Sequence, residues 1–101
     1  MTLTVQNQLT LLHDLLDEQM SHKNGSVAEY QQIKRLVQSL TANKQVSNGQ
    51  LLQLLPEIYN YGLQGEIAQS LPEHITTNKA NIETWKNVIQ HINQLANGRF
   101  D

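Results

Sequence analysis

Hydrophobic residues recur at helical spacing along almost the whole chain. Near the N-terminus they are separated by steps of four, three, four and four residues, with acidic and amide residues on the opposite side. Such spacing gives an α-helix one apolar face. It predicts a first helix over about residues 4–20, ended by Lys23-Asn24-Gly25, because glycine adopts the left-handed conformation at little cost. The apolar face consists of Val5, Leu9, Leu12, Leu16 and Met20, widened by Leu11 and Leu15.

The second helix is predicted to begin at a capping box. Ser26 stands three residues before Glu29, so its hydroxyl can accept a hydrogen bond from the amide of residue 29 while the carboxylate reaches back. The helix is expected to end near Asn43 and to carry one narrow apolar stripe. That stripe consists of Tyr30, Ile33, Leu36, Val37 and Leu40.

A second capping-box pattern, Ser47 to Gln50, predicts the start of a leucine-rich third helix. At about 100° per residue, its apolar side chains cover roughly half of the circumference. Pro56 falls on the polar half, where a proline only bends the helix around its core. We expect this helix to end at Gly62. Its apolar residues are Leu51, Leu52, Leu54, Leu55, Ile58, Tyr59 and Tyr61.

The C-terminal part is expected to hold one short helical piece and one long helix. The short piece covers residues 66–71, between Gly65 and Pro72. The long helix starts at about Pro72 or Thr77 and ends near Asn97; if it is continuous from Pro72, it is about 25 residues and 37 Å long. The residues alone leave the choice between the two starts open. The apolar positions are Ile75, Ile82, Trp85, Val88, Ile89, Ile92, Leu95 and Ala96.

These elements define the fold class. No segment alternates between apolar and polar residues in the way that predicts a strand. The connections are short, which favours antiparallel neighbours. A length of 101 residues is typical of one domain. We therefore predict an all-α fold, an antiparallel bundle of four main helices plus one short helical turn, formed by residues 1–101 as a single domain.

Charge and composition exclude several classes of function. The formal net charge is −2, and the seven basic residues are scattered, so the clustered positive charge that nucleic-acid binding requires is missing. The absence of cysteine excludes thiol catalysis and cysteine-based zinc sites. No segment is apolar enough to cross a membrane, and the N-terminus lacks the features of a secretory signal. We expect a cytoplasmic protein that binds neither nucleic acid nor membrane.

Four segments of the chain carry a recognisable pattern: Gln8-Leu-x-Leu-Leu-x-Asp-Leu-Leu16, Gly25-Ser-Val-x-Glu-Tyr-x-Gln-Ile-x-Arg-Leu36, Leu55-Pro-Glu-Ile-Tyr-x-Tyr-Gly62, and His74-Ile75 followed by Ile82-x-x-Trp85. In this order they resemble the YtzH-like proteins, a family of small proteins of Bacillus and its relatives. The resemblance covers about residues 8–92 and implies the cytoplasm of a Firmicute, but it brings no activity with it. One departure stands out: the family has cysteines just before the glycine of the first turn, where this chain has Lys23-Asn24, so no thiol role applies here.

Candidate metal ligands are few. His13 and Asp17 are four residues apart on the first helix and share a face. A stable site needs three or four ligands, and no H-E-x-x-H or E-x-x-H pattern supplies the others. The neighbouring Asp14 and Glu18 are expected to be solvated charges. We predict no metal site.

No catalytic constellation is recognisable either. There is no Gly-rich phosphate loop, nucleophile elbow or carboxylate pair of known spacing. His22 and His91 lack the surroundings of a phosphotransfer histidine, because His22 falls in a predicted turn and His91 is followed by Ile92. We therefore predict no enzymatic activity, no catalytic residue and no cofactor.

One candidate pocket is formed by His74, Asn78 and Asn81, which fall on the otherwise apolar side of the last helix. A polar pocket inside the bundle could hold a small molecule. The alternative is that this stretch overhangs the bundle, or that the last helix starts only at Thr77. The second interpretation is favoured, because a helix of that length must overhang something.

The other candidate is a protein-binding face on the third helix. Tyr59 and Tyr61 point about 200° apart, so they cannot both enter the core by the same route. Tyr and Trp are also enriched at binding hot spots, and the proposed face includes Leu55 and Trp85. Burial of a central helix on two sides explains the same pattern. The leading functional hypothesis is a protein–protein interaction module or homodimer without catalytic activity; the alternative is a small-molecule or metal-binding bundle.

Overall fold

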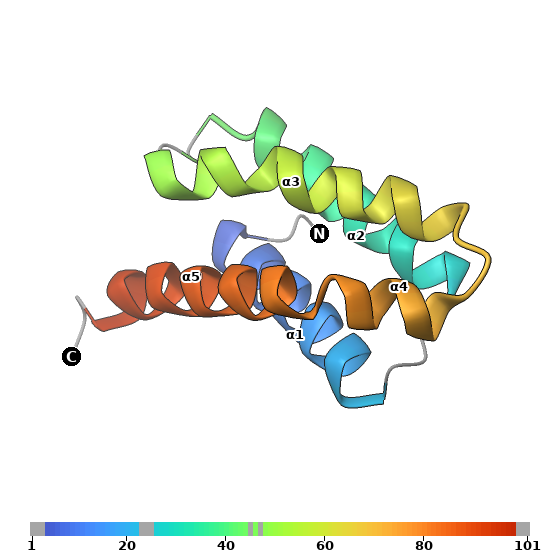
Figure 1. The fold of residues 1–101 in the computed structure, drawn as a ribbon. Helices are drawn as coiled ribbons and strands as arrows, with labels where there is room; N and C mark the ends of the chain where they lie inside the picture. Colours follow the sequence, from blue (N-terminus) through green and yellow to red (C-terminus); the bar gives the residue numbers. More distant parts are fainter. Residues whose placement is uncertain (1–3, 23–25, 45, 47, 99–101) are drawn as a thin grey trace.

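The computed structural model describes residues 4–22, 26–44, 46 and 48–98, and those residues are helical apart from their connections (Figure 1). This part of the chain contains no strand, which confirms the predicted all-α class. The helices are α1 (Val5–His22), α2 (Val27–Ala42), α3 (Gly49–Glu66), α4 (Leu71–Thr77) and α5 (Lys79–Gly98).

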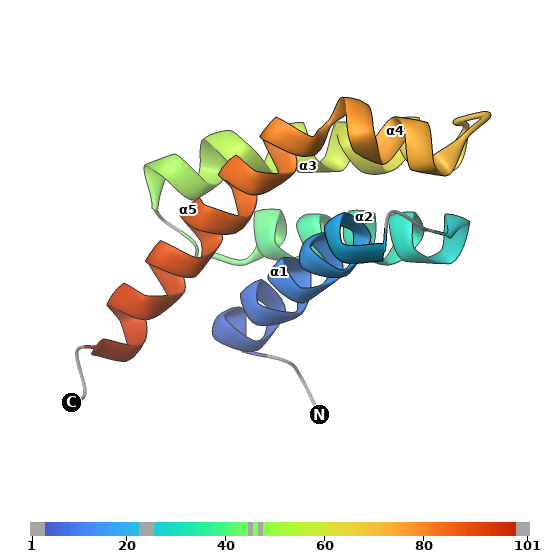
Figure 2. The ribbon, with the colours of Figure 1, turned by 60° about the horizontal axis from the view of Figure 1, so that its bottom comes forward.

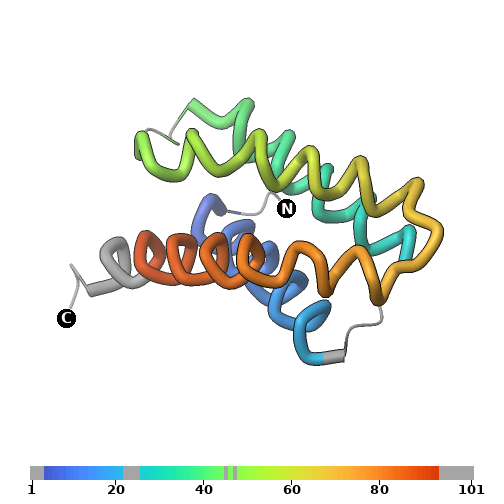
Figure 3. Tube along the Cα trace, in the orientation of Figure 1, coloured from blue at the N-terminus to red at the C-terminus, as the bar shows by residue number. Residues whose placement is uncertain are grey.

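The helices are arranged as two antiparallel pairs, with α4 between them at one end. Helices α2 and α3 form a hairpin, and α1 lies along α5 (Figures 1 and 2). The tube in Figure 3 shows the two pairs diverging on the side of the C-terminus and approaching each other near α4. The molecule is therefore elongated, with principal extents of 43 × 25 × 23 Å.

The core draws on every helix. Periodic apolar residues of α1 and α2 face inward as their spacing predicts, and α4 contributes one residue, Ile75. Large side chains fill the junction where α4 meets the two pairs. The fully buried large side chains are Tyr30, Tyr61, Leu12, Leu16, Ile33, Leu40, Leu51, Leu55, Ile58, Ile75, Ile82 and Ile89.

The predicted end of the third helix at Gly62 is wrong, because α3 continues to Glu66. Gly62 and Gly65 are buried on the side of α3 that faces α2. A Cβ atom at Gly62 would lie 2.6 Å from Cγ of Lys34, and one at Gly65 would overlap the ring of Tyr30. The two glycines therefore allow the close approach of two helices within the hairpin, and neither ends a helix.

The prediction of a short helical piece over residues 66–71 is also wrong. Residues 67–70 form a non-helical connection, and the short helix is α4, which follows it. The side chain of Ser70 accepts a hydrogen bond from the amide of Glu73 at 3.4 Å, and Pro72 occupies the first turn, where its missing N–H costs nothing. These two residues make α4 begin where the sequence also allowed the long helix to begin.

The long helix continuous from Pro72 does not occur, because the chain is interrupted at Asn78. Its amide bonds to the carbonyl oxygens of His74 and Ile75 at 3.2 and 3.1 Å, and its side chain donates to His74 O at 2.8 Å. Asn78 thereby caps α4, while its own carbonyl accepts from Ile82 N in the first turn of α5. The chain changes direction between α4 and α5 (Figure 2).

The other predictions about helix caps and Pro56 are confirmed in part. Ser26 caps α2 as predicted, accepting from the amide of Glu29 at 3.2 Å. The cap of α3 is Asn48, whose side chain accepts from Leu51 N at 3.0 Å; the predicted cap, Ser47, lies outside the described residues. Pro56 lies inside α3 on an exposed position, as its place on the polar half predicted.

Candidate functional site

Helix α3 presents three faces with different chemistry. Its buried residues occupy one arc of the helix. A second arc, about 120° from the centre of the first at 100° per residue, carries apolar residues spaced by four, three and four positions. The remaining arc is polar and includes Glu57, Asn60 and Gln64; we call it the amide face. We call the second arc the α3 stripe; it consists of Leu52, Pro56, Tyr59 and Leu63.

The exposed large hydrophobic side chains are confined to one region of the described chain. Leu52 and Leu63 of the α3 stripe are each 41 % exposed. Ile67, directly after α3, is 83 % exposed, and Val27 at the start of α2 is 45 % exposed. All four belong to the α2–α3 hairpin or its immediate continuation. The described part of α1, α4 and α5 exposes no large hydrophobic side chain to this extent.

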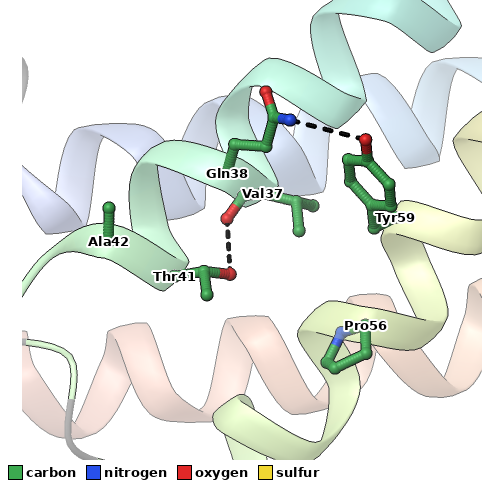
Figure 4. Close-up of a pocket in the computed structure, with 6 residues that line it drawn as sticks. All are labelled: Val37, Gln38, Thr41, Ala42, Pro56 and Tyr59. Carbon is green, nitrogen blue, oxygen red and sulfur yellow. Dashed lines mark hydrogen bonds between the residues drawn. The ribbon is translucent and has the colours of Figure 1, made fainter.

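The α3 stripe borders a groove between α2 and α3 (Figure 4). The groove has a volume of about 420 Å³, and most of its lining is apolar. On the α2 side, the hydroxyl of Thr41 donates to the carbonyl of Val37 at 2.8 Å, so the polar atom of this wall is already satisfied. The lining residues are Val37, Gln38, Thr41, Ala42, Pro56 and Tyr59.

Tyr59 forms the middle of the groove wall on α3. Its hydroxyl accepts a weak hydrogen bond from Nε2 of Gln38 at 3.4 Å (Figure 4). The ammonium of Lys34 lies 5.9 Å from the centre of its ring, within the range of a cation–π contact. The ring is therefore held against α2 from two sides while it stays partly exposed. Tyr59 is positioned before any partner binds.

The charges beside the groove are basic or already paired. Lys34 forms an ion pair with Glu66 across the hairpin. Arg35 is exposed and forms no ion pair with a described residue. On α2 it lies three residues before Gln38 and seven before Ala42, which puts it on the same strip of the helix. The edge of the groove therefore carries net positive charge.

A second candidate site lies on the amide face of α3. Two shallow depressions adjoin there, of about 420 and 280 Å³, and both are lined by Gln64 and Asn78. His74 lines the larger one and Asn81 the smaller one. The interruption at Asn78 thus places the three predicted pocket residues along one polar surface. The two depressions also contain one carboxylate each, Glu73 in the larger and Glu57 in the smaller.

Beneath this surface lies a buried aromatic cluster. The ring of Tyr61 stacks on His74 with 4.8 Å between centroids, and it meets Tyr30 and Trp85 edge-on at 5.4 and 5.5 Å. The Tyr61 hydroxyl donates to Oε1 of Gln19 at 2.6 Å, and the Tyr30 hydroxyl lies 3.1 Å from Nδ1 of His74. Each of the five helices contributes one residue, so this cluster joins the whole bundle at one point.

Burial changes the acid–base properties of this cluster. It raises the pKa of the Tyr30 and Tyr61 hydroxyls, which therefore stay protonated. It lowers the pKa of His74, so this imidazole is neutral at pH 7. Nε2 of His74 and Nε2 of Gln19 are buried and have no hydrogen-bond partner among the described residues. The cluster is a structural network with two unmet polar atoms.

The four residues predicted to form a protein-binding face are separated by the fold. Leu55, Tyr61 and Trp85 are buried in the core, and the indole N–H of Trp85 donates to Oε1 of Glu57 at 3.3 Å. Only Tyr59 contributes to the surface, as a wall of the groove. Tyr61 occupies a core position, and Tyr59, two residues before it, occupies a groove position. The two side chains therefore point in different directions.

Sequence reasoning missed the α3 stripe as a separate feature. Leu52 and Tyr59 were included in one broad apolar half together with the core positions, Pro56 was placed on the polar half, and Leu63 lay beyond the predicted helix end. The 4-3-4 spacing of Leu52, Pro56, Tyr59 and Leu63 was visible in the sequence, as was the heptad-like character of such spacing. The α2 wall of the groove had no comparable signal, because Thr41 and Ala42 follow the last residue of a regular core stripe.

The candidate metal ligands of α1 are not brought together with others. Asp17 bonds to the ammonium of Lys86 at 2.6 Å, which lowers the pKa of its carboxyl group, and Nδ1 of His13 faces Asp14 at 3.4 Å. Within the described ranges, no three His, Asp or Glu side chains are close enough to hold a metal ion. His91 is exposed on α5, and the side chain of His22 is outside the described set.

No described helix is both long and apolar enough to span a membrane. A family model for YtzH-like protein matches residues 3–92. Among curated relatives, uncharacterized protein YtzH of Bacillus subtilis (strain 168) is 31 % identical over 85 residues, which cover 84 % of this chain and 91 % of the relative. No solved structure matches the chain.

Proposed function

The chain belongs to the YtzH-like family, and we propose that it is a protein–protein interaction module whose binding surface is the outer face of the α2–α3 hairpin. We propose further that it acts in the cytoplasm, without catalysis or a cofactor. One observation carries the proposal: the exposed large hydrophobic side chains of the described chain all belong to this hairpin or follow it directly. Exposed apolar side chains gathered on one part of a molecule are typical of interaction sites.

The energetics favour a partner that covers the groove and the stripe together. Burying a whole leucine side chain contributes roughly 1.5–3 kcal/mol, and Leu52 and Leu63 have less than half of their surface left to bury. Association itself costs roughly 4–15 kcal/mol. One or two residues cannot offset that cost, so the partner has to contact the length of α3 and the α2 wall as well. Tyr59 at the centre suits a hot spot, since it is aromatic and already held in place.

Site-specific photo-crosslinking in the native host tests this proposal. A benzophenone amino acid is placed at Leu63, in the α3 stripe, and as a matched control at Ala80, an exposed residue of α5. We expect a crosslinked protein product from position 63 and none from position 80. Absence of a product at 63, or equal products at both positions, would contradict the proposal. Light scattering over a wide range of concentration shows whether a second copy is the partner.

A second candidate function is binding of a small polar molecule on the amide face. The observation that favours it is the pair of adjoining depressions that contain His74, Asn78 and Asn81. Thermal melts with sugars, amino acids, polyamines and divalent metals test it, because a ligand of the folded state raises the melting temperature. The increase should disappear in Asn81→Ala and persist in Gln90→Ala, an exposed control on α5. If no compound raises the melting temperature, this candidate fails.

A further inference from the structure

We infer that the partner of the α2–α3 groove is an amphipathic helix that places an acidic side chain against Arg35. This inference rests on the proposed function and specifies the class of partner for the same surface. It depends on the spacing of the stripe, the shape of the groove and the sign of the charges that border it.

The spacing of the stripe matches a helix. Leu52, Pro56, Tyr59 and Leu63 follow steps of four, three and four, the pattern of one side of a helix–helix seam. From Leu52 to Leu63 the stripe extends about 16 Å at 1.5 Å per residue, or three turns. The described residues contain no strand, so they offer no sheet edge to which an extended peptide could add. A partner helix of three or more turns therefore fits the full stripe.

The groove is shaped to receive large side chains from that helix. Its α2 wall has small residues, Thr41 and Ala42, opposite Pro56 and Tyr59 on α3 (Figure 4). Small residues on one wall leave the space of about 420 Å³ open between the two helices. Apolar side chains of a third helix can enter this space as knobs enter the holes of a helical bundle.

The charges beside the groove select an acidic partner. Arg35 is exposed on the groove side of α2, while Lys34 and Glu66 are paired with each other. Glu57 lies about 120° around α3 from the stripe at 100° per residue, and it accepts a bond from Trp85. Glu29 of α2 lies about 180° around that helix from Gln38 at the same spacing. The carboxylates of the hairpin are thus either paired or turned away from the groove. An acidic side chain next to Arg35 gains attraction, and a basic one in the same place is repelled.

A second copy of the chain fits this surface less well. When two α3 stripes pair antiparallel about a two-fold axis, both α2 helices lie on the same side of the seam. The two copies of Arg35 would then be on that side together. The one carboxylate of α3 that is also there, Glu66, is already paired with Lys34. Charge therefore favours a different chain over self-association.

Two synthetic helical peptides of 21 residues, an arbitrary design length of roughly six turns, test the inference. Both have leucine at the a and d positions; one has Glu and the other Lys at the e and g positions. Binding to the full chain is measured by fluorescence anisotropy, and the site is mapped by amide chemical shifts. We expect the acidic peptide to bind about threefold to tenfold more tightly than the basic one, with shifts along the stripe and groove. The substitution Leu63→Ser should weaken binding of the acidic peptide.

Charge reversal supplies the matched control. Arg35→Glu should remove or invert the preference for the acidic peptide, whereas Lys79→Glu changes the net charge equally on exposed α5 and should leave it intact. Equal binding of both peptides at the stripe would overturn the inference and leave the proposed function standing. Binding of neither peptide would overturn the inference, while crosslinking at position 63 decides the proposed function independently. A mass that doubles with concentration, with shifts at the stripe, would identify a second copy and overturn the inference as well.

Discussion

The two helix pairs of this bundle differ in the polarity of their outer surfaces. Helices α1 and α5 are joined at their exposed edges by polar contacts, Lys86 to Asp17 at 2.6 Å and Asn93 to Thr10 at 2.8 Å. Helices α2 and α3 approach closely through two glycines, yet leave Leu52 and Leu63 exposed. Among the residues whose side chains are described, the α1–α5 pair leaves no large hydrophobic side chain as exposed as these. This difference is the basis for the proposal that the hairpin contacts another chain.

On the inner side of the hairpin, buried contacts determine how α2 packs against α3. Tyr30 is wedged between Gly65 and the aromatic cluster, so the position of α2 relative to α3 is determined from within. The same packing sets the geometry of the groove on the outer side of the hairpin. Its shape is therefore set before binding, which reduces the ordering cost that a partner must offset.

The largest expected effect comes from closing the space between α2 and α3. In Gly65→Ala the new Cβ overlaps the buried Tyr30 ring, so we expect a loss of about 3 kcal/mol, the upper end for overpacking. Gly49→Ala is the matched control, because nothing lies within 4 Å of a Cβ there. The control should be neutral or stabilised by up to about 1 kcal/mol. Urea denaturation measures both; equal stabilities would mean that the glycine does not determine the helix spacing.

The second prediction compares the inner and outer tyrosines. Tyr61→Phe removes the donor to Gln19 and leaves a buried amide without its 2.6 Å bond, at a cost of about 1–2 kcal/mol. Tyr59→Phe removes only a 3.4 Å bond at a partly exposed position and should change stability by less than about 0.5 kcal/mol. Chemical denaturation of both variants checks the difference. If Tyr59→Phe lost more stability than Tyr61→Phe, the assignment of Tyr61 as the tyrosine that stabilises the core would be wrong.

A third prediction concerns pH and the cluster behind the amide face. Burial lowers the pKa of His74 in the folded state, while the unfolded chain keeps about 6.5. Between these two values the unfolded state binds more protons, so the free energy of unfolding decreases as pH falls below about 6.5. Tyr30, Tyr61 and Glu73 are the titratable groups nearest to the ring. His74→Gln should show a smaller decrease between pH 7 and 5; an identical pH profile would count against the assignment.

The smallest effect is expected where the α1–α5 pair is joined by charge. Lys86→Ala breaks the pair with Asp17, which is 54 % exposed, so the cost should be about 0.2–1 kcal/mol and should shrink in high salt. Because Lys86 lowers the pKa of Asp17, that pKa should rise in the variant. Carboxyl titration by NMR tests the second point. An unchanged Asp17 titration would mean that the contact is not populated in solution.

Helix identity was largely predictable from the sequence, because the core positions of α1 and α2 repeat at regular helical steps. Ser26 also identified the start of α2 through its side chain. Such signals are local: they depend on residues three or four positions apart and need no knowledge of the fold.

Most of the errors occur where tertiary contacts decide between local alternatives. Gly62 was interpreted as a helix end and Gly65 as the residue before a short helical piece, but α3 needs both because Tyr30 and Lys34 press against it. Tyr59 and Tyr61 gave the correct divergence and no indication of which one enters the core. The separation of α4 from α5 at Asn78 depends on a capping asparagine inside an otherwise helical stretch. The contacts of the glycines and tyrosines cross between helices, whereas the cap at Asn78 is local and competes with continuation of the helix.

The buried cluster has a further consequence for how the chain folds. Its hydrogen bonds join Gln19 to Tyr61 and Tyr30 to His74, residues separated by 42 and 44 positions. No fragment that lacks one helix can assemble it, so its formation should coincide with the final cooperative step rather than with local helix formation. The single tryptophan, Trp85, lies in this cluster against Tyr61. Its fluorescence is therefore an intrinsic reporter of that step, and far-UV dichroism, which records helices, should detect earlier events if any precede it.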